Sequence, residues 1–304
     1  MTLTIHRFES VSSTNDLAIG MAEEGAPEGT VVVALEQTAG KGRYGRHWVS
    51  PAGGLYLSII LRPDVPFDKL WQTAFVSSLA ACEAIGEVSG LAARIKWPND
   101  VLLNGRKVCG ILVETRSASG RMGEWESGRV GEGTFKVQGS TSNEKTAPTA
   151  SPGIPQCPPC LCGSITPGDP QSAIRNPKSE MMRAVVVGIG MNVNNEAFPA
   201  EIAETATSIA LEVGHPISMG KEEESLLSHL NARYEQYVQD GFDPILEAWR
   251  VLDCTAGRRV EVNTPEGLVT GTALEVDSSG DLIVQRDDGS TTRITAGDVI
   301  LRDA

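Results

Sequence analysis

The chain has 304 residues, enough for one large domain or two smaller ones around a sizeable apolar core. Its formal net charge of −13 at pH 7 argues against nonspecific nucleic-acid binding or an anionic membrane surface as the main interaction. No apolar run approaches the ~20 residues of a membrane-spanning helix, and the first residues lack a signal-peptide pattern. The six cysteines do not suggest a disulfide framework, so we expect a cytoplasmic protein.

Apolar patterning predicts alternating strands and helices through most of the chain. In chain order these are a helix at 12–25, strands at 30–37 and 55–62, a helix at 67–88, strands at 93–97, 107–114 and 183–194, and helices at 218–240 and 242–252. After Cys254 the pattern changes to short strands separated by Gly, Pro and Asp turns, which predicts a small all-β barrel. The expected domains are therefore 1–252 and 253–304.

One segment, from about 117 to 182, loses this periodicity and fills with Gly, Ser, Thr and Pro. Loops longer than ~15 residues in a compact domain are usually functional or disordered, and we expect a disordered insertion. Residues 169–175 and 176–182 form an imperfect duplication, as repetitive insertion would produce. The segment also holds Cys157-x-x-Cys160-x-Cys162, but a structural zinc site needs four ligands and no fourth lies nearby.

The most informative segment is Gly40-Lys41-Gly42-Arg43-Tyr44-Gly45-Arg46, between two predicted strands. It matches the G-x-G-x-x-G dinucleotide pattern, but a Rossmann turn opens a helix, and a strand follows here. The motifs that accompany a kinase glycine loop are missing, and the P-loop pattern does not occur. Three cations this close together repel one another unless an anion lies among them, and glycines let backbone N–H groups close around it. The loop indicates either a phosphate or carboxylate ligand or a solvated basic turn.

Three further clusters place polar groups at the ends of predicted strands. Lys96-Trp97-Pro98-Asn99-Asp100 offers an amide and a carboxylate that suit a nucleotide and Mg²⁺, although an Asx turn explains the same residues. Lys107 heads an apolar strand, where it either points into a cleft or protects a strand start. Gly188-Ile189-Gly190-Met191-Asn192 suits either a ligand or a close backbone crossing. Each cluster is weak alone, but the four in this order are specific.

With these blocks the sequence resembles the biotin–protein ligases, or biotin–[acetyl-CoA-carboxylase] ligases. The matching blocks are Ser12–Asn15, Glu36–Trp48, Ser50–Tyr56, Lys96–Asp100, Lys107–Glu114 and Val187–Asn192. The resemblance covers nearly the whole chain except the insertion. It implies an α+β fold, with a mixed sheet flanked by helices as in class II synthetases, followed by a small SH3-like β-barrel.

The resemblance also implies a two-step reaction that uses ATP and Mg²⁺. The carboxylate of biotin attacks the α-phosphate of ATP to give biotinyl-5′-AMP and pyrophosphate, and a lysine of a biotin carboxyl carrier domain then displaces AMP. The expected partner is such a domain of acetyl-CoA carboxylase or a similar enzyme, with no nucleic acid, no membrane and no tightly bound cofactor. A homodimer is compatible with the resemblance. The winged helix-turn-helix of ligase-repressors is not seen, so no transcriptional role is expected.

The resemblance carries the family's functional residues onto matching positions of this chain. The catalytic cations are Lys107 and Arg43. The biotin-binding residues are Ser13, Thr14, Asn15, Gln37, Lys41, Gly42, Arg43, Lys107 and Gly110. The nucleotide-binding residues are Arg46, Trp48, Asn99 and Asn192, and the candidate Mg²⁺ ligand is Asp100.

These assignments fit the chemistry of the ligands. The ureido group of biotin is neutral, so Ser13, Thr14 and Gln37 suit it better than charged groups would. Cations offset the repulsion between a carboxylate and a triphosphate. Lys41 stands where an arginine is frequent in the family, and this leaves its exact contact open because lysine lacks bidentate reach.

Two alternative functions share these features. A lipoate ligase has the same architecture and adenylate chemistry, but the uncharged trio favours a ureido ligand over a dithiolane. A non-catalytic biotin-binding protein would tolerate Arg43→Gly. If the glycine loop instead closes as a lid over a labile acyl adenylate, the same substitution should let the intermediate leak.

Overall fold

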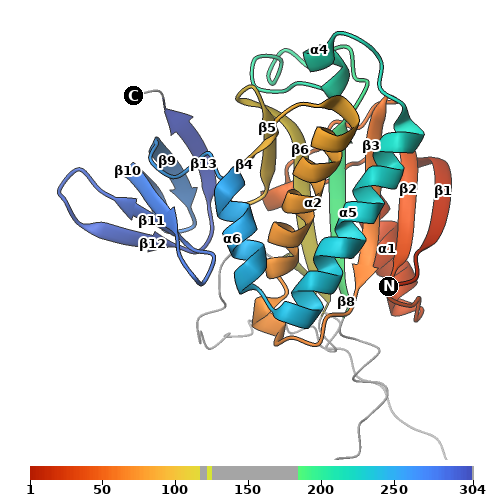
Figure 1. Ribbon diagram of the computed structural model, residues 1–304, viewed down its shortest axis with the longest axis horizontal. Coiled ribbons are helices and arrows are strands. Elements are labelled where there is room, and N and C mark those ends of the chain that lie inside the picture. The colour runs from red at the N-terminus through yellow and green to blue at the C-terminus, as the bar shows by residue number, and fades with distance from the viewer. Residues whose placement is uncertain (117–121, 125–183, 303–304) are drawn as a thin grey trace, which may run out of the picture. The chain divides into compact units, whose positions relative to one another are not determined.

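The computed structural model describes residues 1–116, 122–124 and 184–302, which form two β-sheets with helices packed on the first (Figure 1). The first sheet holds β1 (Thr4–Val11), β2 (Thr30–Gln37), β3 (Gly54–Leu61), β4 (Arg94–Lys96), β5 (Asp100–Leu103), β6 (Arg106–Arg116), β7 (Met122–Glu124) and β8 (Ala184–Asn192). The second sheet holds β9 (Arg259–Thr264), β10 (Gly267–Val276), β11 (Leu282–Gln285), β12 (Thr291–Ile294) and β13 (Asp298–Arg302). The helices are α1 (Thr14–Glu23), α2 (Gln72–Ser89), α4 (Ile209–Val213), α5 (Met219–Asp240) and α6 (Asp243–Leu252), with short 3₁₀ turns η1 (Arg43–Gly45) and η2 (Phe67–Lys69).

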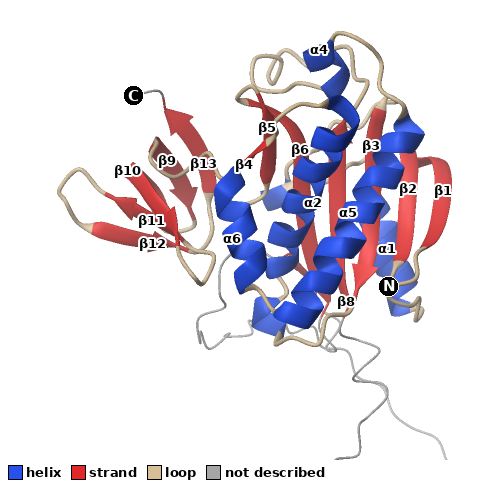
Figure 2. Cartoon of the chain, in the orientation of Figure 1, coloured by secondary structure: helices blue, strands red, loops and turns tan. Residues whose placement is uncertain are grey.

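The first sheet has the strand order β1-β2-β3-β8-β6-β5-β4, with β7 paired to β6. Only β1 and β2 pair in parallel among these strands. Figure 2 shows α2, α5 and α6 on one face and α1 on the other. The central strand β3 is buried along its whole length, which explains its continuous apolar sequence, since a strand covered on both faces needs no polar alternation.

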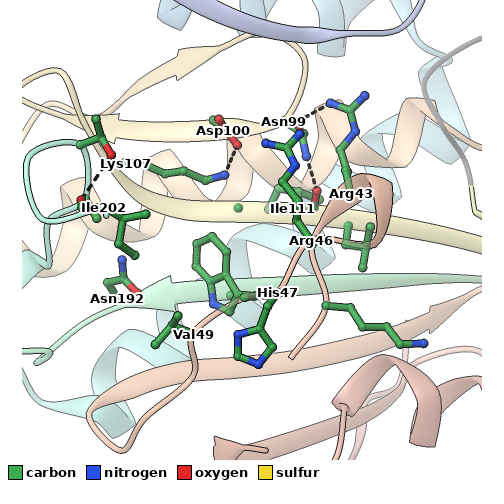
Figure 3. Close-up of a pocket in the computed structure, with 18 of the residues that line it drawn as sticks. Arg43, Arg46, His47, Val49, Asn99, Asp100, Lys107, Ile111, Asn192 and Ile202 are labelled. Carbon is green, nitrogen blue, oxygen red and sulfur yellow. Dashed lines mark hydrogen bonds and ion pairs between the residues drawn. The ribbon is translucent and has the colours of Figure 1, made fainter. Parts of the chain in front are cut away.

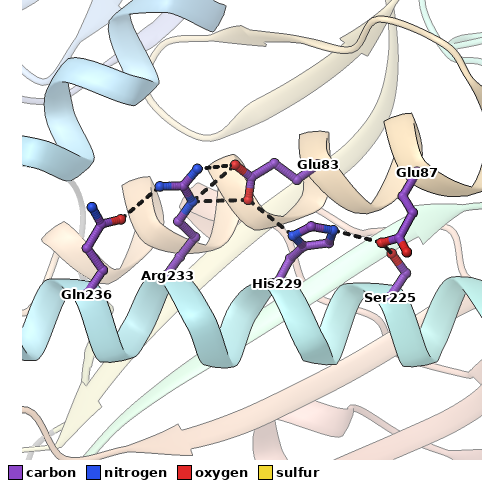
Figure 4. Close-up of polar contacts among 6 residues, drawn as sticks. All are labelled: Glu83, Glu87, Ser225, His229, Arg233 and Gln236. Carbon is purple, nitrogen blue, oxygen red and sulfur yellow. Dashed lines mark hydrogen bonds and ion pairs between the residues drawn. The ribbon is translucent and has the colours of Figure 1, made fainter.

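The helices α2 and α5 pack against each other and cover the main core. On their outer side Arg233 donates to both carboxylate oxygens of Glu83, and His229 lies between Glu83 and Glu87 (Figure 4). Deeper in the same interface, Glu222 is fully buried, and neither of its carboxylate oxygens has a hydrogen-bond partner among the described residues. Burial, with a smaller contribution from the charge of Glu87, raises the pKa of Glu222 to about 7.

The C-terminal sheet has the order β12-β11-β10-β9-β13, and the chain leading into it bonds to β4, since the N–H of Cys254 donates to the carbonyl of Ile95 (2.9 Å). The backbone N–H of Trp97 donates to the hydroxyl of Thr255 (2.8 Å), and its indole N–H donates to the carbonyl of Gly280 (2.9 Å). Gly280 has φ +74°, and a Cβ there would lie 2.2 Å from the ring of Trp71, so this turn requires glycine. The indole of Trp97 therefore joins the two sheets instead of facing a ligand.

The arrangement is the predicted fold class, with five strands and helices that the sequence did not reveal. These are β1, β5, β7, β13 and α4, and β7 lies within the segment expected to be a disordered insertion. The predicted helix at 67–88 is in fact a 3₁₀ turn followed by α2, which ends at Ser89. Within the described ranges, no helix is long and apolar enough to cross a membrane. The predicted duplication and the three-cysteine cluster lie outside the described residues.

Candidate active site

All the residues proposed from the sequence line one cavity of about 720 Å³. They are Ser13, Thr14, Asn15, Gln37, Lys41, Gly42, Arg43, Arg46, Trp48, Asn99, Asp100, Lys107, Gly110 and Asn192. They come from the start of α1, the end of β2, the glycine loop between β2 and β3, the β4–β5 turn, and strands β6 and β8. Segments far apart in the sequence thus converge on one site.

The floor of the cavity is made by two glycines on neighbouring strands. Gly110 of β6 and Gly190 of β8 face each other in register. A Cβ on Gly190 would lie 2.6 Å from the indole nitrogen of Trp48, and one on Gly110 would lie 3.1 Å from the same ring. The indole therefore lies directly against the glycine floor. Its other neighbour is Lys107, whose Nζ is 5.1 Å from the ring centroid, within cation–π range.

One end of the cavity is lined by uncharged polar groups in fixed positions. Thr14 donates to the side-chain carbonyl of Gln37 through both its backbone N–H (2.8 Å) and its hydroxyl (3.0 Å). The amide nitrogen of Gln37 donates to the hydroxyl of Ser50 (2.9 Å). Ser13 caps α1, its hydroxyl accepting from the backbone N–H of Asp16 (3.4 Å). This end suits a neutral ligand with several donors and acceptors.

Asn15 lies at the same end but is only 3% exposed, because its amide is bonded on both sides. The amide nitrogen donates to Glu114 (2.6 Å), and the carbonyl oxygen accepts from Ser58 (2.5 Å). A Cβ on Gly188 would lie 2.1 Å from that oxygen. Asn15 thus packs tightly against β8, and its direct contact with biotin stays a prediction.

The opposite end of the cavity is cationic. Asp100 forms an ion pair with Lys107 (2.5 Å, Figure 3) through one carboxylate oxygen and with Lys96 (2.9 Å) through the other. Burial alone would raise the pKa of Asp100, but the two lysines outweigh it and hold the pKa well below its usual range. Asp100 is therefore a fixed anion that orients two cations.

The backbone of Lys107 is also fixed from outside its own strand. Its N–H donates to the carbonyl of Thr205 (2.7 Å), and its carbonyl accepts from the N–H of Thr207 (2.9 Å). Both hydrogen bonds come from the stretch that precedes α4. The backbone of Lys107 is thus held both by its neighbouring strands and by the stretch before α4.

Asp100 does not fit a magnesium site held by the protein in this arrangement. Both of its oxygens already face lysine ammonium groups. Among the residues that the structure describes, no group of three or more His, Cys, Asp or Glu could hold a metal ion. Magnesium coordination by Asp100 stays a prediction that this geometry does not favour.

The glycine loop forms a small hairpin beside the cavity. The N–H of Gly42 donates to the carbonyl of Arg46 (2.7 Å), and that of Trp48 donates to the carbonyl of Gly40 (2.8 Å). The hairpin turns at Tyr44 (φ 57°) and Gly45 (φ 67°). None of the three residues of η1 at this turn is buried. A strand follows the loop, as expected, so the glycine spacing does not form a Rossmann turn, which leads into a helix.

Side chains attach this hairpin to its surroundings. Arg43 donates to the side-chain carbonyl of Asn99 (3.1 Å, Figure 3), and Lys41 pairs with Asp16 (2.5 Å). Asn99 is itself bonded to β6, because its backbone carbonyl accepts from the N–H of Ile111 (3.0 Å). The cations of the loop thus point toward the cavity and its rim.

Two parts of the cavity wall were not expected from the sequence. One is the stretch before α4, with Phe198, Pro199 and Ile202, and the other is the segment around β13, from Asp298 to Leu301. The first stretch has no apolar periodicity that would have marked it. The second belongs to a strand that was not predicted, and its role depends on how the two sheets dock.

Comparison with known proteins agrees with this geometry. Residues 7–124 match the model of the biotin/lipoate A/B protein ligase family, and residues 255–302 match the biotin protein ligase C terminal domain. The chain is 32% identical over 279 residues to the biotin–[acetyl-CoA-carboxylase] ligase of Paracoccus denitrificans, covering 90% of each protein. The chain belongs to the biotin protein ligase family. The family predicted from the sequence is thereby confirmed.

Other members of the biotin protein ligase family are similar over most of the chain. The bifunctional ligase/repressor BirA of Bacillus subtilis is 31% identical over 282 residues, which are 92% of this chain and 68% of BirA. The solved structure of the biotin protein ligase from Aquifex aeolicus in complex with biotin and ATP covers 99% of both chains, with a TM-score of 0.69 and 22% identity. At that identity the likeness shows the same fold.

Proposed function

We propose that this protein activates biotin with ATP to biotinyl-5′-AMP and transfers the biotinyl group to a lysine of a biotin carboxyl carrier domain. The observation that carries this proposal is the polarity of the cavity. Ser13, Thr14 and Gln37 line one part of the cavity, with Lys41 paired to Asp16 beside them, and Lys96, Lys107 and Arg43 line another part. Biotin has the same polarity, with a neutral ureido group at one end and a carboxylate at the other.

The uncharged end recognises the ureido group through groups that are already fixed. Gln37 holds one orientation because Thr14 donates to its carbonyl and Ser50 accepts from its nitrogen. A site preorganised in this way loses little entropy when a ligand binds. It also rejects ligands without the matching donors and acceptors, because its buried polar groups would then be left unpaired.

The cationic end supports the first chemical step. A carboxylate oxygen of biotin forms a bond to the α-phosphorus, and the bond from that phosphorus to the pyrophosphate oxygen breaks. Two anions meet in this step, so Lys107 and Arg43 would offset their repulsion and stabilise the charge that develops on the phosphoryl oxygens. Asp100 keeps Lys107 in place through its ion pair.

In the second step the acceptor amine attacks the carbonyl carbon of the anhydride, and AMP leaves with the electrons of the broken C–O bond. The attacking lysine must first lose a proton. Asp100 is a poor acceptor for that proton, because its pKa is held well below its usual range. We assign it a positioning role toward Lys107 and Lys96 instead of a role as general base.

The proposal also covers the metal, the partners, the location and the domain limits of the protein. Mg²⁺ would enter with ATP, and the protein partner would be the carrier domain. A cytoplasmic location, the absence of a nucleic-acid partner, and the domain limits 1–252 and 253–304 are further parts of it, and a homodimer is compatible with it.

The test is a mass measurement on the acceptor. The protein is incubated with ATP, Mg²⁺, biotin and a purified carrier domain, and mass spectrometry should show a gain equal to one biotinyl group. The gain should require ATP and disappear when the acceptor lysine is replaced by arginine. An acceptor that another ligase can biotinylate, but that gains nothing here, would contradict the proposal. Equal or greater modification with lipoate would show that the substrate is a dithiolane acid.

A further inference from the structure

Several residues of the C-terminal domain line the cavity, and one short segment beside it, Gly297–Val299, bonds to the catalytic domain. All three residues of the segment bond to basic side chains of the other domain. The carbonyl of the first residue accepts from Arg43 (3.4 Å), the carboxylate of Asp298 pairs with Arg46, and the carbonyl of the last accepts from Lys96 (3.1 Å). Two of these three cations belong to the glycine loop. Adenylate chemistry as such does not explain why this loop should be tied to a second domain.

We propose that Asp298 is a positioning residue that holds the glycine loop over the cavity and slows escape of the bound adenylate. It acts through Arg46, which lies three residues after Arg43 in the same hairpin. This inference rests on the proposed function, since the loop retains an adenylate only if one is formed there.

The loop depends on contacts outside the hairpin because its internal contacts shape the turn but do not pack it against the rest of the domain. Two backbone hydrogen bonds join Gly42 to Arg46 and Gly40 to Trp48, and a third runs across the turn from the N–H of Arg46 to the carbonyl of Arg43 (3.2 Å). At the tip, Arg46 lies over the ring of Tyr44, 5.7 Å from its centroid, and no residue of η1 is buried. Because the tip is not held by packing, the ion pair with Asp298 and the contacts of Arg43 decide where it lies.

The C-terminal segment is suited to anchor this tip because it is itself fixed. A Cβ on Gly297 would lie 2.6 Å from a methyl of Val262 and 3.0 Å from the carbonyl of Asn263 on β9, so the segment is packed closely onto its neighbour strand. The domain is in turn joined to the turn after β4 through the two hydrogen bonds of Trp97. Asp298 therefore has a defined position relative to the cavity floor.

The ion pair is also weak enough to open. The side chain of Arg46 is 57% exposed and that of Asp298 is 34% exposed, so water and salt reach both charges. Exposed ion pairs contribute little each, and removal of this one should speed adenylate release only about two- to fivefold. A contact of this size delays release of the intermediate without preventing access by an acceptor.

The experiment compares Asp298→Asn with the unchanged protein. Each is loaded with biotin and ATP in the absence of acceptor, and free biotinyl-5′-AMP is measured over time after rapid filtration. We expect release about two- to fivefold faster in the variant, with the difference shrinking at high salt, while the KM for biotin and the thermal midpoint stay unchanged. The matched control is Asp287→Asn, which breaks the exposed Arg259–Asp287 pair in the same domain away from the cavity, and it should release at the original rate.

A charge exchange separates positioning from general destabilisation. Arg46→Asp should speed release, and Arg46→Asp combined with Asp298→Arg should bring it back toward the original rate. Release at the original rate in Asp298→Asn would overturn the inference, and so would fast release that the exchange does not reverse. If the unchanged protein forms no adenylate, the proposed function itself fails, whereas adenylate held equally well by both proteins removes only the role of Asp298.

Discussion

Gly110 and Gly190 face each other on two neighbouring strands of the main sheet, whereas Arg43 and Arg46 reach the same cavity from a turn with no buried residue. The floor is held by the β6–β8 ladder and by the core behind it. The loop is shaped by three backbone hydrogen bonds of its own and is attached to its surroundings by side chains. The difference teaches that the two regions have separate tasks. We infer that the floor determines which ligand fits and that the loop determines how long the proposed adenylate stays.

The largest expected effect concerns Lys107, whose backbone and side chain are both held in place. Lys107→Ala should lower kcat/KM for adenylate formation about 100- to 1000-fold, because a preorganised charge opposite the developing negative charge is lost. Pyrophosphate release under single-turnover conditions measures it. Lys69→Ala, an exposed lysine of η2 outside the cavity, is the control and should have no effect. An equal loss of kcat/KM in Lys107→Ala and Lys69→Ala would show that the position of Lys107 in the cavity does not matter.

The second prediction tests the shape of the floor. Gly190→Ala places a Cβ 2.6 Å from the indole nitrogen of Trp48, so the ring must move. Displacement of a site group by about 1 Å typically costs about 100-fold, and we expect a loss of that order in kcat/KM for biotin. Gly20→Ala in α1, where a Cβ meets nothing within 4 Å, should leave activity unchanged. Full activity in Gly190→Ala would show that the floor is not a close-fitting surface.

The third prediction concerns the support behind the floor. The pKa of Glu222 is raised to about 7, so the folded protein favours the protonated form. Stability should therefore fall as pH rises from the ordinary carboxyl pKa toward 7 and stay low above it. Glu222→Gln should raise the free energy of unfolding by roughly 1–3 kcal/mol at pH 8 and much less at pH 5. Denaturant unfolding at the two pH values measures this, with exposed Glu224→Gln as control. A gain of the same size at both pH values would rule out ionisation as the cause.

The smallest of these four effects concerns the loop itself. Arg43→Gly removes the hydrogen bonds to Asn99 and to the carbonyl of Gly297. Losing a few hydrogen bonds made by a charged group should speed release of free biotinyl-5′-AMP about tenfold, a larger effect than that expected for Asp298→Asn. Biotinylation of bystander lysines by the released adenylate provides a second measurement. Unchanged retention would mean that the floor, and not the loop, holds the intermediate.

Much of the fold and the site could be predicted because their signals are local. Strand β3 is buried on both faces and reads as a continuous apolar run, and the glycine loop is followed by a strand that excludes a Rossmann turn. The candidate residues occur in short blocks at the ends of strands, and all of them line one cavity. Local sequence patterns place such residues well because strand ends meet at the edge of a sheet.

Other features left no local signal. Strand β1 is an edge strand without buried residues, so its sequence lacks the apolar alternation that marks a half-buried strand. Asp298 was missed because its importance arises from the docking of one domain on another, and Arg46 gave no hint that it pairs with a residue 252 positions later. The sequence proposed Asp100 as a candidate metal ligand but gave no sign that its two oxygens pair with Lys96 and Lys107, and its role toward a metal stays a prediction.

Trp97 and its neighbours in the Lys96–Asp100 motif face different parts of the molecule. Its neighbours Lys96 and Asp100 face the cavity, whereas its own indole is 1% exposed and bonded to the turn at Gly280. The five residues from Lys96 to Asp100 therefore contribute both to the cavity and to the contact with the C-terminal domain. Swapping the C-terminal domain for that of a relative would transplant a wall of the active site along with it. A chimera of this kind should work only when the turn that receives Trp97 and the segment that receives the loop are exchanged together.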